Sequence, residues 1–97
     1  MARASVIAPG RRTRRWAMCT GAGASPESLR EAYKLGVDTL IVGEGPHHTA
    51  VEAPELALVI IYAGHYASET LGVRAIAAHA AAHFDLPWEF IPSPTGL

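Results

Sequence analysis

The stretch "ALVIIYAGHYASET", residues 57–70, decides the fold, because it joins an apolar strand directly to a helix. Its first part is continuously apolar, which is typical of a strand buried on both faces of a sheet. After a glycine, the apolar side chains recur at helical spacing. The stretch therefore predicts a strand over 57–62, followed by a helix from about 66 to 84.

Turn and capping signals on either side of this stretch place the remaining elements. Ser25 has the side chain of a helix N-cap, Pro26 suits the first helical position, and Gly36 suits the C-terminal cap. The elements predicted in this way are strands over 14–19, 37–42 and 86–92 and helices over about 26–35 and 46–53. Alternating strands and helices, β-α-β-α-β-α-β, predict an α/β layered fold with a largely parallel or mixed sheet. Cys19 closes the first strand, and we expect it to be buried there.

Length and composition limit the class of protein. Ninety-seven residues, of which 49% are hydrophobic and 18% charged, indicate one globular domain. The longest apolar run, 57–63, is far shorter than the roughly 18 residues that a membrane span needs. The single cysteine excludes an internal disulfide and favours the reducing cytoplasm. We therefore expect a cytoplasmic protein that does not enter a membrane.

Charge is distributed unevenly along the chain, although the net charge is only −1. Residues 1–15 contain five arginines and no acid, whereas residues 16–97 contain three basic side chains and nine acids. This division predicts a basic N-terminal arm over 1–15 and an α/β domain over 16–97. The arm suggests a contact with nucleic acid, but only Trp16 is available near it to stack on bases. A solvated turn and an edge strand kept soluble by arginines is therefore the favoured interpretation.

His65 and Glu69 stand out within residues 57–70 because both are polar in an apolar setting. Glu69 falls about 40° from Val73 on a helical wheel, inside the apolar stripe, where a carboxylate needs a partner or a cation. His65 lies one turn earlier, at the carboxyl end of the buried strand, the edge where ligands bind in α/β folds. An imidazole and a carboxylate four residues apart provide half of a site for zinc, manganese or iron.

Three further polar residues follow the neighbouring predicted strand. Glu44, His47 and His48 come at its carboxyl end and could face the same crevice as His65. In the alternative interpretation, Glu44 caps the next helix and the two histidines are exposed on its first turn. Spacing alone leaves both interpretations open.

Four segments in the same order resemble one known family. They are "CTGAGAS" (19–25), "GVDTLIVGEGPHHTAVEA" (36–53), "AGHYASETLGVRAIA" (63–77) and "WEFIPSPTG" (88–96). Together they resemble the C-terminal third of the Nif-three-like proteins, which are often labelled GTP cyclohydrolase I type 2 homologs. The resemblance begins at about Trp16 and extends over nearly the whole remaining chain.

The resemblance implies a dinuclear metal site of divalent ions. His65 and Glu69 would be ligands, and His48, with Glu44 and His47, would support them around the same site. A water bridging the two ions would be the nucleophile of a hydrolytic reaction. Members of the family form homo-oligomers, which implies a second copy of the chain as a partner.

The departures from the family pattern modify this expectation. Ser68 and Val42 replace threonines of the pattern, and no segment matches the family's N-terminal region with its His-His pair and aspartate. We therefore expect a partial, hydrolase-like metal-binding domain that is inactive alone. The alternative is a non-catalytic protein-interaction module, or a subunit whose split metal site is completed by a partner chain.

Overall fold

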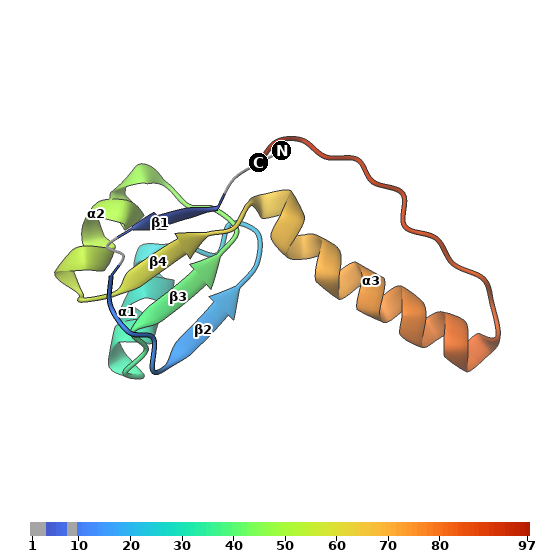
Figure 1. Ribbon diagram of the computed structural model, residues 1–97, viewed down its shortest axis with the longest axis horizontal. Helices are drawn as coiled ribbons and strands as arrows, with labels where there is room; N and C mark the ends of the chain where they lie inside the picture. Colours follow the sequence, from blue (N-terminus) through green and yellow to red (C-terminus); the bar gives the residue numbers. More distant parts are fainter. Residues whose placement is uncertain (1–3, 8–9) are drawn as a thin grey trace.

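A four-stranded mixed sheet forms the body of the computed structural model, which describes residues 4–7 and 10–97 (Figure 1). The strand order across the sheet is β1-β4-β3-β2. β3 is parallel to both β2 and β4, whereas β1 runs antiparallel to β4. The strands are β1 (Ser5–Ile7), β2 (Trp16–Cys19), β3 (Thr39–Val42) and β4 (Val59–Tyr62). The predicted α/β fold with a largely parallel or mixed sheet is confirmed.

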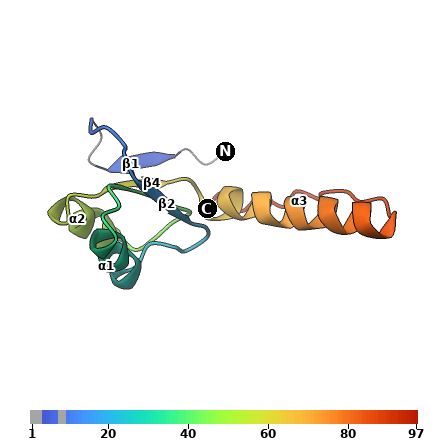
Figure 2. The same cartoon turned by 90° about the horizontal axis from the view of Figure 1, so that it is seen from below.

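Two helices, α1 (Pro26–Lys34) and α2 (His47–Glu55), lie on the same side of this sheet (Figure 2). α1 begins as the sequence predicts, because the Ser25 side chain accepts a hydrogen bond from the amide of Ser28 at 3.0 Å. Gly36 follows the helix with φ +72°, the left-handed conformation that glycine adopts readily. The apolar side chains between these helices and the sheet form the core: Ala24, Leu29, Ala32, Val37, Leu40, Val42, Ala53, Leu58 and Ile60.

The opposite face of the sheet carries apolar side chains that remain accessible. We call this the open sheet face and define it by the residues that alternate with the core positions along the strands: Val6, Trp16, Met18, Ile41 and Ile61. Trp16 is 59% exposed and Met18 50% exposed. The predicted burial of Cys19 is wrong, because β2 is an edge strand and its last residue is exposed.

A long third helix, α3 (His65–Phe84), projects away from the sheet (Figure 1). None of its residues is buried. The expectation that its apolar stripe is buried, with Glu69 inside it, is therefore wrong: Ile76 is 71% exposed and the Glu69 side chain 53%. The helix extends beyond the sheet, so no second layer packs on the stripe. Two more histidines on α3, His79 and His83, are exposed.

The C-terminal tail, residues 85–97, runs back alongside α3 (Figure 1). The strand expected over 86–92 is absent from it, because the tail follows the helix and reaches neither edge of the sheet. Two hydrogen bonds attach its end to the start of α3. The Ser93 amide donates to the Tyr66 hydroxyl at 2.7 Å, and the Tyr66 amide donates to the Leu97 carbonyl at 3.0 Å.

Residues 4–7 and 10–15 belong to the segment expected as a basic arm, and Arg3 of that segment lies outside the described residues. β1 pairs along one edge of the sheet, and the connection to β2 is held by Asp38. One carboxylate oxygen of Asp38 accepts hydrogen bonds from the amides of Arg14 and Arg15, each at 3.0 Å. Partial burial alone would raise the pKa of Asp38, but the hydrogen bonds from Thr39, Arg15 and Arg14 together lower it below its usual value.

Within the described residues, no helix combines the length and the apolar character that crossing a membrane requires.

Candidate metal centre

The carboxyl ends of β2, β3 and β4 lie at one edge of the sheet, because the three strands are parallel. Gly21 follows β2, Glu44 follows β3, and His65 follows β4 as the first residue of α3. The amide of Gly64 donates to the carbonyl of Gly43 at 2.8 Å, which continues the pairing of β3 and β4 beyond the strands. The topology therefore brings the side chains of Glu44 and His65 together from loops 21 residues apart in the sequence.

The imidazole of His65 is held between two carboxylates. Its Nδ1 lies 2.9 Å from Oε1 of Glu44, and its Nε2 lies 3.2 Å from Oε2 of Glu69. All three side chains are partly accessible to solvent. The hydrogen bond with Glu44 raises the pKa of His65, the charge of Glu69 adds to this effect, and partial burial opposes it.

Gly21 allows the backbone to approach this cluster closely. It is buried, has φ +66°, and donates its amide to the Ser68 hydroxyl at 2.9 Å. A Cβ at this position would lie 3.3 Å from Nε2 of His65 and would overlap the Glu69 carboxylate. The sequence offered a signal for this role in the glycine pair of "TGAGAS", although it did not show that this turn reaches His65.

Gly43 lies against Gly21 and Ser68 in the same cluster. A Cβ on Gly43 would lie 2.6 Å from the Ser68 hydroxyl and would overlap the backbone of Gly21. The amide of Glu44 donates to the carbonyl of Gly21 at 2.7 Å. The two glycine loops are therefore packed backbone to backbone, and the Ser68 side chain joins them to the first turn of α3 beside His65.

The donor atoms present fit part of a cation site. Two ligands at about 2.0–2.2 Å from a tetrahedral ion are separated by about 3.3–3.6 Å, which is close to the 3.2 Å between Nε2 of His65 and Oε2 of Glu69. A carboxylate on the other ring nitrogen, as Glu44 provides, is the usual partner of a metal-binding histidine. In the described part of the chain, no group of three or more His, Cys, Asp or Glu side chains is arranged to hold an ion. The cluster therefore offers two ligands and one orienting carboxylate.

His47 and His48 lie outside this cluster. Both are exposed on the first turn of α2, whose N-cap is Pro46 without a side-chain cap hydrogen bond. The alternative interpretation, in which Glu44 caps α2, is therefore wrong for Glu44, because its carboxylate is hydrogen-bonded to His65 instead. The supporting role of His47 and His48 stays a prediction.

Buried Thr49 anchors the loop that carries Glu44. Its hydroxyl lies 2.6 Å from the Tyr62 hydroxyl on β4 and donates to the carbonyl of Pro46, also at 2.6 Å. Thr49 is fully buried, so these bonds fix the start of α2 against the sheet. This anchor holds the Glu44 loop at the edge where His65 lies.

Comparison with known proteins identifies the family. A family model described as Duf34/NIF3 (NGG1p interacting factor 3) matches residues 2–95. The chain belongs to the Duf34/NIF3 family. The resemblance noted from the four sequence segments is confirmed.

Relatives named GTP cyclohydrolase 1 type 2 homolog are similar to this Duf34/NIF3 chain. The protein of Deinococcus radiodurans is 44% identical over 78 residues, covering 80% of this chain and 28% of the relative. The protein of Halobacterium salinarum is 47% identical over 81 residues, covering 84% of this chain and 31% of the relative. The chain thus spans less than a third of the length of these relatives.

Solved structures agree with the fold. The protein ybgI superposes with a TM-score of 0.75 at 35% identity, covering 84% of this chain and 32% of that one. TTHA1606 from Thermus thermophilus superposes with a TM-score of 0.68 at 44% identity, covering 82% of this chain and 31% of that one. Reduced HcgD from Methanocaldococcus jannaschii superposes with a TM-score of 0.66 at 30% identity, covering 73% of this chain and 28% of that one.

Proposed function

We propose that His65 and Glu69 are ligands in a dinuclear, hydrolase-like metal centre to which this chain contributes only a part. The observation that carries the proposal is the imidazole of His65, held at Nδ1 by Glu44 and facing Glu69 at Nε2. The name that the relatives share, GTP cyclohydrolase 1 type 2 homolog, supports a related chemistry. With two ligands, the chain alone binds a divalent ion weakly and is inactive.

Each residue of the cluster has a separate role in this proposal. Glu44 accepts a hydrogen bond from Nδ1–H, which leaves the lone pair of Nε2 available on the side of Glu69. Gly21 brings the backbone against the pair, and Ser68 fixes that loop through its hydrogen bond. A bound divalent ion would supply Lewis acidity and an activated water. Imidazole and carboxylate donors suit zinc, manganese and iron alike.

Calorimetric titration of the full chain with Zn²⁺ and Mn²⁺ tests the assignment. We expect weak binding that is lost in His65→Ala and in Glu69→Ala. Glu44→Gln should retain binding with about a 10- to 100-fold lower affinity, the usual effect of removing an orienting carboxylate. His79→Ala is the matched control, because this histidine is exposed on the same helix. Binding that survives in His65→Ala, or that disappears in His79→Ala, would contradict the assignment.

A second candidate function is a non-catalytic interaction module, or a subunit whose metal site a partner chain completes. The open sheet face and the unburied α3 favour it, because both leave apolar side chains accessible. The two forms differ in one measurement. If a partner chain completes the site, adding it should raise the Zn²⁺ affinity of the wild type but not of His65→Ala. An interaction module should bind its partner equally well as the wild type and as the His65→Ala variant.

A further inference from the structure

We propose that residues 88–91 of one copy add as an edge strand to the free edge of β2 in a second copy of this chain. Reciprocal exchange of the two tails closes a dimer, because the same two surfaces meet twice. The proposal does not depend on metal binding. It rests on an unpaired extended segment, an unpaired sheet edge, and the match of side chains between them.

The segment "WEFI", residues 88–91, has the composition of a strand but no strand partner. Its N–H groups donate to no backbone carbonyl in the part of the chain that the structure describes. Ile91 is 76% exposed, and Trp88 is 46% exposed. An exposed extended segment of this kind is free to add to a sheet edge, where its main-chain groups form inter-strand hydrogen bonds.

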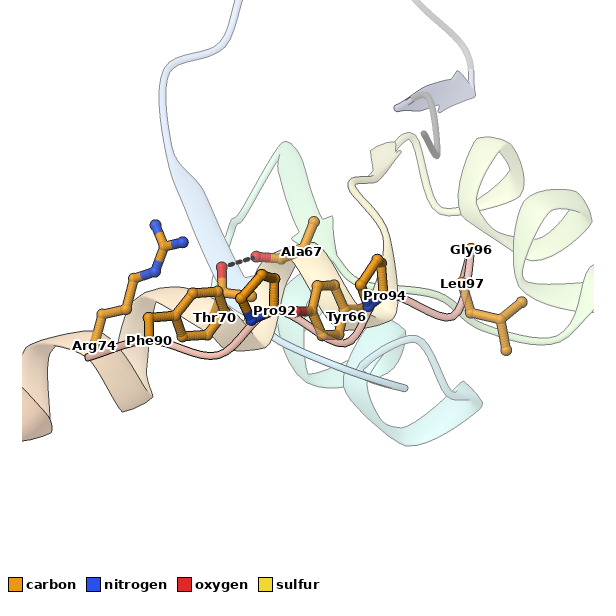
Figure 3. Close-up of a pocket in the computed structure, with 9 residues that line it drawn as sticks. All are labelled: Tyr66, Ala67, Thr70, Arg74, Phe90, Pro92, Pro94, Gly96 and Leu97. Atoms are coloured by element: carbon orange, nitrogen blue, oxygen red, sulfur yellow. Dashed lines mark hydrogen bonds between the residues drawn. The ribbon is translucent and has the colours of Figure 1, made fainter.

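The tail is only loosely attached to α3. A cavity of about 700 Å³ lies between them, lined by α3 residues such as Tyr66 and Thr70 and by two prolines of the tail (Figure 3). Arg74 contacts this segment by stacking on the Phe90 ring, with its guanidinium carbon 4.0 Å from the ring centre. Because the cavity leaves this segment loosely packed, moving residues 88–91 off the helix costs mainly the Arg74–Phe90 contact.

β2 offers the matching sheet edge. It is the last strand of the order β1-β4-β3-β2 and is bonded to β3 on one side. The carbonyl of Arg15 accepts from the amide of Thr39, and neighbouring residues of a strand point their backbone groups to opposite sides. The backbone groups of Trp16 and Met18 therefore face the free edge. The chain's own tail runs beside α3, away from this edge, so a second copy supplies the partner (Figure 1).

Side-chain alternation fixes the face of the sheet that each residue of the added strand takes. When Trp88 lies opposite Trp16, Phe90 lies opposite Met18, and the two aromatic rings extend the apolar open sheet face. Glu89 then lies on the other face, diagonal to Arg15. A shift of this register by one residue would instead place the Glu89 carboxylate on the apolar face.

Charge complementarity supports the same pairing. The residues that lead into β2 include exposed arginines. The residues that lead into the tail segment include Asp85, and the segment itself contains Glu89. The exposed arginines are Arg11, Arg12, Arg14 and Arg15. Opposite charges at such an interface fix the register and disfavour other pairings.

Sedimentation equilibrium on the full chain tests the proposal with a charge exchange. We expect the wild type, of 10.3 kDa per chain, to sediment as a dimer. Arg15→Glu and Glu89→Arg should each raise the dimer dissociation constant about 3- to 10-fold, and the double variant should restore it to within about twofold. Lys34→Glu makes the same charge change on α1 and should leave dimerisation unchanged. Circular dichroism confirms that each variant is folded.

Two results would overturn the proposal. One is a wild-type chain that stays monomeric at all accessible concentrations. The other is a dimer whose dissociation constant is the same in the single variants as in the wild type, or does not return to the wild-type value in the double variant. Retention of Zn²⁺ binding in these variants would show that the interface and the metal site are separate.

Discussion

Replacing Gly21 by alanine tests how closely the backbone approaches the His65–Glu69 pair. The glycine has φ +66°, and forcing alanine into the left-handed region costs about 1–2 kcal/mol. The new Cβ would also overlap the Glu69 carboxylate and lie 3.3 Å from Nε2 of His65. Because Glu69 is half exposed, its side chain can move aside, so the collision should displace the carboxylate and add little to the loss of stability.

Gly36→Ala is the matched control. Gly36 has φ +72°, and a Cβ there would meet no atom within 4 Å. Urea unfolding should therefore show similar losses of about 1–2 kcal/mol for both variants, or about 4–16 °C in Tm for a domain of this size. The His65 side-chain NMR signals should change only in Gly21→Ala. Unchanged His65 signals in that variant, or a change of equal size in Gly36→Ala, would refute the close approach.

Three further predictions concern the core, the loop anchor and the edge of the sheet. Leu29→Ala should lower the free energy of unfolding by about 2–5 kcal/mol in urea titrations, because Leu29 is fully buried between α1 and the sheet; a loss below about 1 kcal/mol would contradict that packing. Thr49→Val should lower it by about 1–3 kcal/mol, and a double-mutant cycle with Tyr62→Phe should show coupling, since the two hydroxyls are bonded; strictly additive losses would count against the bond. The lowered pKa of Asp38 stabilises the fold above the unfolded-state pKa of about 3.9, so this contribution should disappear as the pH falls through the folded pKa. Asp38→Asn should remove that part of the acid dependence, measured as Tm against pH, and an unaltered profile would argue against it.

The strands on either side of the helices were predictable because their apolar runs are bounded by clear turn signals. The segments over 14–19, 37–42 and 57–62 contain β2, β3 and β4. β1 is only three residues long and lies among arginines, so the sequence shows it as part of a basic arm. The start of α1 followed its cap, as the hydrogen bond between Ser25 and Ser28 shows.

The errors about α3 and the C-terminal tail share one physical cause. An apolar pattern shows which side chains favour burial, but it does not show whether a second layer is present to cover them. Val73 and Ile76 follow helical spacing and are exposed, because α3 extends past the sheet. The segment over 86–92 has strand-forming residues, but it lies far from a sheet edge of its own chain.

The candidate site was predictable only in part. His65 and Glu69 share a helix, so their spacing places them together without knowledge of the fold. The contact between Glu44 and His65 depends on β3 and β4 being neighbours in the sheet, which the predicted topology made reasonable. The approach of Gly21 depends on the shape of a turn that no periodic pattern describes.

Anomalous diffraction from crystals of this chain soaked in Zn²⁺ would decide whether His65 and Glu69 are metal ligands. We expect an anomalous peak in contact with Nε2 of His65 and the carboxylate of Glu69, with Glu44 still bonded to Nδ1. A peak at the exposed pair His79 and His83, or at His47 and His48 alone, would contradict the assignment. The assignment would also be contradicted if Nε2 of His65 and the Glu69 carboxylate remained in direct contact, with no ion between them, at a Zn²⁺ concentration that saturates the calorimetric titration.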